Sequence, residues 1–185
     1  MRTRDPESKK QQLFEAALAE FAEYGLAGAR MDRLAKRAGI STGLAYSFWD
    51  SKEELFDAVF DQIVALTIAA VPIDADHLPE YAASLYGGGV EHPEVVRFMT
   101  WYRLERGESA QRAAATEAMN DKIAAIAEAQ RHGTVTSAMS PGLVLALVLS
   151  LANMWHQPSE DLRQLVPEKE RRQAVIDAVT RLVAP

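Results

Sequence analysis

A short stretch in the first third of the chain, Ser41, Thr42, Gly43 and Leu44, holds groups suited to recognising an anion or the edge of a base. Ser41 offers an N-cap for a helix that extends to about Phe48, so the first turn of this helix has free backbone amides at the positive end of the helix dipole. Such a turn suits a nearby phosphate. The chemistry it indicates is binding through hydrogen bonds.

Groups for catalysis or metal binding are sparse. The chain has no cysteine, which excludes disulfides, thiolate metal sites and cysteine nucleophiles. The histidines lack metal-ligand spacing, no serine stands in a nucleophile elbow, and the triplet Gly87–Gly89 does not follow a strand as a phosphate-binding loop does. We expect no catalytic residue, no metal and no cofactor, with a helical enzyme as a competing interpretation. The four histidines are His77, His92, His132 and His156.

The composition predicts an all-α protein of about nine helices. Ala, Leu, Glu, Arg and Gln dominate, and proline and glycine divide the chain into helix-sized pieces. Glycine weakens a helix interior, so we expect Gly87–Gly89 to break the end of the fifth helix. The expected helices span residues 6–24, 31–38, 42–48, 52–71, 78–90, 93–106, 109–131, 141–155 and 167–183, with a capping box at Ser51 and Glu54 before the fourth.

The second and third of these helices form a helix-turn-helix pattern. Gly39 supplies the tight turn, where positive φ is needed, and Ala35 is small where the two helices approach. Leu34, Ile40 and Ala45 lie where such a unit packs on its neighbours. The third helix is then held out for the major groove of DNA. A short helix pair of this kind also occurs in proteins that do not bind DNA.

The charge distribution differs between the two ends of the chain. The net charge is −6, but residues 1–52 carry nine basic and seven acidic side chains, and residues 53–185 carry eleven basic and nineteen acidic ones. A mildly basic head on an acidic body suits a protein that places one end on a polyanion. Ordinary surface variation also accounts for so small an excess.

The run from Gly39 to Leu55 supplies a more specific signal. It reads Gly-Ile-Ser-Thr-Gly-Leu-Ala-Tyr-Ser-Phe-Trp-Asp-Ser-Lys-Glu-Glu-Leu. In order and length it closely resembles the DNA-binding signature of the TetR (tetracycline-repressor-like) family of transcriptional regulators, and the resemblance covers residues 10–60. It implies an N-terminal three-helix DNA-binding domain, residues 1–52, followed by a larger helical domain, residues 53–185, for effector binding and dimerisation.

The resemblance assigns roles to individual positions. It implies that Thr42, Gly43 and Leu44 face base edges and that Tyr46 and Lys52 reach the phosphate backbone. The same surface includes three further residues, and the complete expected DNA-binding set is Arg30, Ser41, Thr42, Gly43, Leu44, Tyr46, Ser47 and Lys52.

Some positions depart from the family pattern. Arg30 replaces a hydroxyl residue that caps the second helix, so a cap is lost while a phosphate contact is gained. Leu44 replaces a polar reader, Ser47 a second aromatic, and Phe48–Trp49 a His-Phe pair. Leu44 can pack on a thymine methyl group but cannot donate or accept a hydrogen bond. We therefore expect few hydrogen bonds between this helix and the base edges.

The body of the chain carries two apolar helices that suit a dimer interface. The run Gly142–Ala152 is apolar on every side, and the last helix has an apolar stripe. In the resembled family the last two helices pair with their copies in a four-helix interface, although burial within one subunit is an alternative. The expected interface residues are Leu143, Leu147, Leu151, Val175, Val179 and Leu182.

Aromatic side chains in the sixth and eighth helices suit a pocket for a small, largely apolar effector. The same stripes also suit a plain core. The family analogy places a cavity among these helices, which favours a ligand site at Phe98, Trp101, Tyr102, Asn153, Trp155 and His156.

Together these features predict a homodimeric repressor that leaves its double-stranded operator when an effector binds. A ligand-independent DNA-binding dimer that acts through a protein partner is the alternative. The N-terminal segment has no apolar signal core and Gly142–Ala152 is too short to span a bilayer, so we expect a cytoplasmic protein without a membrane partner.

Overall fold

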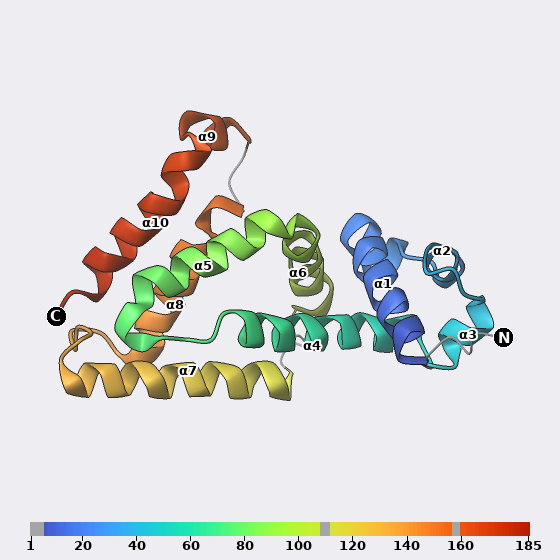
Figure 1. Cartoon of the computed structure of the whole chain (residues 1–185), viewed down its shortest axis with the longest axis horizontal. Coiled ribbons are helices and arrows are strands. Elements are labelled where there is room, and N and C mark those ends of the chain that lie inside the picture. Colours follow the sequence, from blue (N-terminus) through green and yellow to red (C-terminus); the bar gives the residue numbers. More distant parts are fainter. Residues whose placement is uncertain (1–5, 108–111, 157–159) are drawn as a thin grey trace. The chain divides into compact units, whose positions relative to one another are not determined.

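The computed structural model describes residues 6–107, 112–156 and 160–185, which form ten α-helices and no strand (Figure 1). The all-α prediction is confirmed. The helices are α1 (Pro6–Gly28), α2 (Met31–Arg37), α3 (Thr42–Tyr46), α4 (Lys52–Ala70), α5 (Leu78–Glu91), α6 (Pro93–Arg106), α7 (Ala113–His132), α8 (Pro141–Asn153), α9 (Glu160–Leu165) and α10 (Glu168–Val183). Two 3-10 turns, η1 (Ala75–His77) and η3 (Met154–His156), precede α5 and follow α8.

The chain packs as two compact units. The first contains residues 1–65 and 93–112, and the second contains residues 66–92 and 113–185. The boundary predicted at residue 52 divides the chain by function and stays a prediction. The packing follows a different division, because α6 lies against α1 in the first unit rather than beside α5, its neighbour in sequence.

The core of the first unit is an aromatic cluster between α1, α4 and α6. The Phe21 and Phe56 rings meet edge to face with centroids 4.9 Å apart, and Phe98 lies 5.0 Å from Phe56. Tyr102 stacks on Phe60 with a centroid distance of 4.1 Å. These rings tie the helix that precedes the helix-turn-helix to α4 and α6.

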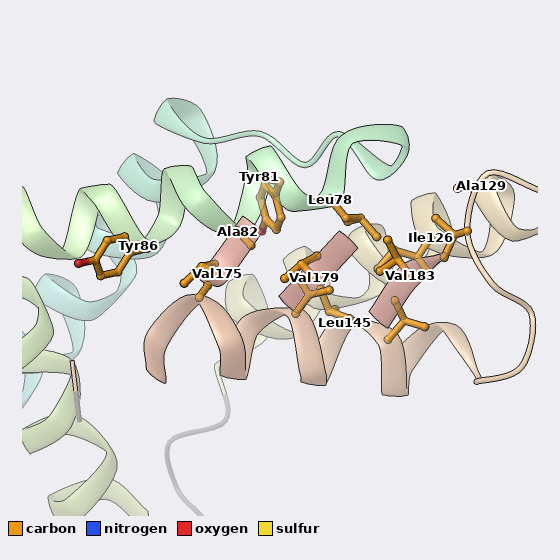
Figure 2. Packing of buried hydrophobic residues seen from close by; sticks show 14 of the residues in the cluster. Leu78, Tyr81, Ala82, Tyr86, Ile126, Ala129, Leu145, Val175, Val179 and Val183 are labelled. Carbon is orange, nitrogen blue, oxygen red and sulfur yellow. The ribbon is translucent and has the colours of Figure 1, made fainter. Parts of the chain in front are cut away.

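The core of the second unit is an apolar cluster in which α10 packs on α5 and α8, and α7 packs on α8. Figure 2 shows Val175, Val179 and Val183 of α10 facing α5. Each of these valines is buried, and they repeat at intervals of four residues, as one face of a helix requires. Leu145 and Ile126 bring α8 and α7 into the same cluster.

The predicted break at Gly87–Gly89 is wrong, since α5 continues through the triplet to Glu91. The reason lies at Gly89, where a Cβ atom would stand 2.7 Å from His156 Cε1 and closer still to Nε2. A glycine is therefore needed for the close approach of His156, not for a change in the path of the helix.

Two other helix predictions need correction. The helix α9 was not predicted, because a piece of six residues between Ser159 and Pro167 gives too short a periodic signal. The predicted end of α1 at Gly25 is a kink at which φ is 66°, and the helix resumes as far as Gly28. The predicted start of α7 at Ser109 lies outside the described residues.

In the part of the chain that is described, no single helix is both long and apolar enough to cross a membrane. Only a bent pair, Lys52–Ala70 with Ala75–Glu91, reaches the required length and composition together.

Candidate nucleic-acid interface

The helix α3 is short, and side-chain caps hold both of its ends. At the N-terminus the Ser41 hydroxyl accepts a hydrogen bond from the Leu44 amide at 3.2 Å, as the sequence predicts. At the C-terminus the Ser47 hydroxyl donates to the Leu44 carbonyl at 2.7 Å. Ala45 is fully buried beneath the helix and Tyr46 is 45% exposed. The outward face of α3 therefore consists of small and hydroxyl groups.

The predicted DNA-binding residues share one exposed region of the first unit. Ser41, Gly43, Tyr46, Ser47 and Arg30 are exposed, and Thr42, Leu44 and Lys52 are half-buried. Nothing stands within 4 Å of the position that a Cβ of Gly43 would occupy, so the backbone there is open to an approaching surface. The side chains needed for a contact with DNA are thus accessible.

The turn between α2 and α3 has the predicted geometry. Gly39 adopts φ of 66°, the left-handed region that favours glycine. Its amide donates to the Lys36 carbonyl at 3.2 Å and the Ile40 amide donates to the Ala35 carbonyl at 3.0 Å, which closes the end of α2. The prediction of a tight glycine turn is confirmed.

A buried carboxylate that sequence reasoning missed supports the start of α2. Arg30 provides no side-chain cap, but Glu20 of α1 accepts hydrogen bonds from the Arg30 amide at 3.1 Å and from Arg33 Nε at 2.6 Å. Glu20 is 0% exposed, so these bonds form away from water. A glutamate within the apolar stripe of α1, ten residues before Arg30, was the available signal. The lost cap is therefore replaced from a different helix.

Lys52 lies at the start of α4 with its ammonium group held in place. Nζ donates to the Ala29 carbonyl at 3.0 Å, which ties α4 to the segment that enters α2. The Ser51 hydroxyl accepts from the Glu54 amide at 3.0 Å, as predicted for a capping box. The Glu54 carboxylate returns to the Asp50 amide at 2.8 Å, one residue before the position expected for a capping box.

The helix α6 holds the segment that leads into α2. Beyond the kink at Gly25 the helical turn starts afresh, and Glu105 accepts hydrogen bonds from the Leu26 amide at 2.5 Å and the Ala27 amide at 3.3 Å. A carboxylate at a helix start satisfies amides that have no partner in the helix. A Cβ on Gly25 would stand 2.9 Å from the Trp101 ring, so glycine is needed at this contact.

The same helix is bound to α4 through Asp57. The Asp57 carboxylate accepts from Arg106 Nε at 2.9 Å and from the Tyr102 hydroxyl at 3.1 Å. Burial, followed by the Asp57 charge, raises the pKa of Tyr102 to about 12, so the phenol keeps its proton. Arg112 pairs with Asp61, and this hydrogen bond raises the pKa of the guanidinium above its ordinary value. The first unit is thus joined by charged pairs as well as by its aromatic core.

Two family models match this chain, one over the helix-turn-helix region and one over most of the remainder. Residues 13–59 match the family model for bacterial regulatory proteins of the tetR family, and residues 77–181 match the tetracyclin repressor-like C-terminal domain. The chain belongs to the TetR family. It is a DNA-binding transcriptional regulator with a helix-turn-helix head, as the resemblance in sequence predicts.

Relatives extend the match over most of the chain. The HTH-type transcriptional repressor SCO4008 of Streptomyces coelicolor is 36% identical over 155 residues, which cover 83% of this chain and 81% of the relative. The regulator RutR of Escherichia coli is 41% identical over 69 residues, 37% of this chain and 32% of its own length. The crystal structure of the transcriptional regulator SCO4942 of S. coelicolor has a TM-score of 0.86 and 32% identity, covering 95% of this chain and 98% of that one.

The residues predicted to line a ligand site are distributed over both units. Phe98 and Tyr102 are buried among other aromatic rings in the core of the first unit. Trp101 lies against Gly25 in the same unit. Asn153, on α8 in the second unit, is exposed and donates to the Leu149 carbonyl of its own helix at 2.8 Å. The structure does not gather the predicted set around one site within a unit.

The remaining two members of that predicted set lie in the second unit, where Trp155 is buried and His156 is half-buried. The His156 ring stacks on Tyr86 with centroids 5.4 Å apart, and Trp155 lies under the Arg171 guanidinium. Trp155 Nε1 and His156 Nε2 are buried without a hydrogen-bond partner among the described residues.

The residues predicted for the dimer interface also separate into two groups. Val175 and Val179 are fully buried within the chain, so they have no surface to offer a second subunit, and the prediction is wrong for these two. Leu143 is 48% exposed, and Leu147, Leu151 and Leu182 are half-buried. The apolar stripe of α10 was assigned to the wrong neighbour, because periodicity shows that a face is buried but not what covers it.

Proposed function

We propose that the chain is a repressor that binds a palindromic or near-palindromic operator as a homodimer and leaves it when a small molecule binds to the second unit. The observation that carries the proposal is α3, a short helix fixed by caps whose exposed side presents Ser41, Gly43, Tyr46 and Ser47. A rigid helix of this kind suits the major groove. The described residues contain no group of three or more His, Cys, Asp or Glu side chains that could hold a metal ion.

DNA binding is tested with operator fragments selected from genomic DNA and measured by fluorescence anisotropy at several salt concentrations. Tyr46→Phe removes only the hydroxyl group, and Lys52→Met removes the ammonium group together with its hydrogen bond to the Ala29 carbonyl. We expect both variants to weaken specific binding at least about tenfold. Lys52→Met also flattens the dependence of log affinity on log salt by about one unit, because a phosphate contact is lost.

The matched control is Lys169→Met, which removes an exposed charge on α10 in the second unit. Its affinity and salt slope are expected to equal those of the parent. If Tyr46→Phe and Lys52→Met also bound as the parent does, the placement of the DNA surface on α3 and the start of α4 would be wrong.

Dimerisation is supported by apolar side chains left in solvent on α8. Leu143, Ala146, Ser150 and Met154 are exposed and follow a helical spacing along one side of α8 and into η3, and Leu147 is half-buried beside them. Three of these four exposed side chains are apolar, and the Ser150 hydroxyl donates to the Ala146 carbonyl of its own helix at 2.7 Å, so the stripe suits an interaction surface. A C2 dimer buries such a stripe against its own copy. It also supplies the second DNA-binding head that a palindrome requires; we call this head, which consists of α1 to α3 and the start of α4, the reading head.

The interface is tested by light scattering at micromolar concentration. Leu143→Glu and Leu147→Glu are each expected to lower the mass to that of a monomer. Leu104→Glu, which changes a leucine that is 68% exposed on α6, is the control and leaves the mass unchanged. A parent protein that is already monomeric would contradict the proposal.

Release by a ligand is supported by the position of α6, which contacts both α1 and α4 through Glu105 and Asp57. The chain passes from α5 of the second unit directly into α6, so a ligand that displaces α5 would shift α6 and with it α1 and α4. Operator affinity is measured with and without compounds that raise the melting temperature. Unchanged affinity at saturating ligand would leave the ligand-independent dimer as the better interpretation.

A further inference from the structure

A cavity lies in the first unit, among the helices that hold α3 in place. Its volume is about 250 Å³. Its walls come from α1, from α4 and from the two residues that follow α3 and its C-cap Ser47. No residue that is expected to contact DNA or a second subunit lines it. The cavity is therefore a separate feature of the reading head, with a role still to be assigned.

Three aromatic rings line the inner part of the cavity. Trp49 is buried, with 9% of its surface exposed, and Phe14 of α1 and Phe48 are half-buried. The Phe48 and Trp49 rings are tilted by 53° with centroids 5.8 Å apart, so they present two faces at an angle to each other. Such a pair of faces suits a flat ring, which stacks on one face and meets the other edge-on. The inner wall therefore favours a planar, apolar group.

The indole N–H of Trp49 is a donor that a ligand can reach. It forms no hydrogen bond with any described residue, and its nitrogen is not closed off from solvent, although little of the side chain is exposed. Trp155 differs in this respect, because its unpaired nitrogen is closed off by the chain. An indole N–H that is mostly surrounded by protein ordinarily has an acceptor. The cavity therefore favours a ligand that carries an oxygen acceptor.

Exposed polar side chains form the rim of the cavity. They are Lys10 and Gln11 of α1 and Gln62 of α4, and the positive charge of Lys10 is the one charge in the described lining. Glu15 accepts a hydrogen bond from the Gln11 amide at 3.1 Å, but it does not line the cavity. A cationic ligand meets a like charge at this rim, whereas an anion gains an ion pair and the amide donors of the glutamines. The rim therefore favours an anion.

We propose that this cavity binds a small aromatic carboxylate with a single ring. The ring packs against Phe14, Phe48 and Trp49, and the carboxylate supplies both an acceptor for the indole N–H and a negative charge for Lys10. The volume sets the size of the ligand. An apolar cavity of about 150 Å³ holds benzene, so a cavity of about 250 Å³ has room for one ring with a carboxylate. It is smaller than the pockets that take drug-sized ligands.

The site is independent of the ligand response proposed for the second unit, because every residue that lines it belongs to the first unit. Its walls join α1, α4 and the segment that follows α3, which are the elements that position α3. A ligand bound here is therefore a second chemical input that acts at the reading head itself. Failure of the proposal would leave the ligand response of the second unit untouched.

The test follows the indole N–H signals of the full chain by heteronuclear NMR. The chain has three tryptophans, Trp49, Trp101 and Trp155, and Trp49→Phe identifies the signal that belongs to Trp49. Benzoate is titrated beside benzyl alcohol, its uncharged counterpart, and cyclohexanecarboxylate, its non-planar counterpart. We expect benzoate to shift the Trp49 signal saturably with a Kd of about 1 mM or below, and both counterparts to bind several-fold more weakly.

Lys10→Met removes the charge of the rim at an exposed position and should weaken benzoate binding about two- to fivefold. The matched control is Lys9→Met, which changes the neighbouring lysine that does not line the cavity and binds as the parent does. The proposal is overturned if benzoate at about 10 mM leaves the Trp49 signal in place or shifts only those of Trp101 and Trp155. It is also overturned if either counterpart binds as tightly as benzoate, or if the two lysine variants bind alike.

Discussion

The two units differ in how their buried and half-buried polar groups are paired. In the first unit Glu20, Asp57 and Glu105 each accept hydrogen bonds from a different helix or from the segment that enters α2. In the second unit Tyr81, Trp155 and His156 each have a buried polar atom without a partner among the described residues. The first unit has one such atom, Glu20 Oε2. The other oxygen of that carboxylate accepts two hydrogen bonds, from the Arg30 amide and from Arg33 Nε.

This difference matches two physical requirements. A reading head must hold its helices in one arrangement, and polar bonds between helices have strict geometry, so they specify that arrangement. A ligand-binding unit gains affinity from donors and acceptors that the protein itself leaves unsatisfied. The pairing of buried polar groups therefore distinguishes a unit whose helices are fixed to one another by polar bonds from a unit that is held mainly by apolar packing.

The largest effect is expected from removing the central carboxylate of the first unit. Glu20→Ala leaves the Arg30 amide uncapped and Arg33 without its buried partner, and should destabilise the first unit by about 2–3 kcal/mol in urea unfolding. The matched control is Glu23→Ala, which removes the exposed pair with Arg37 and should change stability much less. If the two variants lost the same stability, buried polar pairs would be no more important to this unit than surface pairs.

The next prediction concerns two adjacent glycines of the second unit. Gly89→Ala forces a methyl group against His156 and should destabilise this unit by about 1–2 kcal/mol. Gly88→Ala has nothing within 4 Å of its new methyl group, so it should stabilise α5 by about 0.5–1 kcal/mol. In thermal unfolding, Gly89→Ala should lower the melting temperature and Gly88→Ala should raise it. In a His156→Ala background both substitutions should raise it.

A smaller effect on stability, but a measurable one on operator affinity, is expected for Glu105→Gln. The amide keeps the size of the side chain but is a weaker acceptor for the Leu26 and Ala27 amides, so the segment leading into α2 is held less firmly. Operator affinity should fall several-fold while the salt slope stays unchanged, because no phosphate contact is lost. Glu117→Gln, on exposed α7 surface, is the control. A changed slope would show direct contact with DNA.

The smallest effect is a pH dependence of the second unit. Burial lowers the pKa of His156 below its ordinary 6.5, and the charge of Arg163 lowers it further. The unfolded chain therefore takes up this proton at a pH where the folded chain does not, so its contribution to stability is complete above about pH 6.5 and is lost as pH falls.

The melting temperature of the second unit should accordingly decline on acidification, and His156→Gln should reduce the decline. The exposed His77 has the opposite tendency, because Asp74 raises its pKa and stabilises the protonated form at low pH. A steeper decline in His156→Gln would contradict the assignment.

Local signals in the sequence predicted the reading head well. Ser41 as a cap, Gly39 as a positive-φ turn and the buried Ala45 depend on neighbours within a few residues, so short-range chemistry determines them. Glu20 and Glu105 could not be found in this way, since the amides that they cap lie 10 and 79 residues away in sequence.

The same limit explains the errors in the second unit. The stripe of Val175 and Val179 correctly indicated burial, but only the packing of α10 on α5 shows that the cover is internal. Gly87–Gly89 were interpreted by intrinsic helix propensity, whereas the approach of His156 determines the role of Gly89. Tertiary contacts outweigh local preference at such positions.

The hydrogen bond from Lys52 to Ala29 bears on the thermodynamics of operator binding. A lysine on a protein surface samples many rotamers, and fixing it on a phosphate has an entropic cost. Here one N–H of the ammonium already points to a carbonyl, and two remain for an anion. In the proposed complex the side chain keeps its conformation, so its contact with a phosphate should form with little loss of side-chain entropy and without a slow search for the correct rotamer.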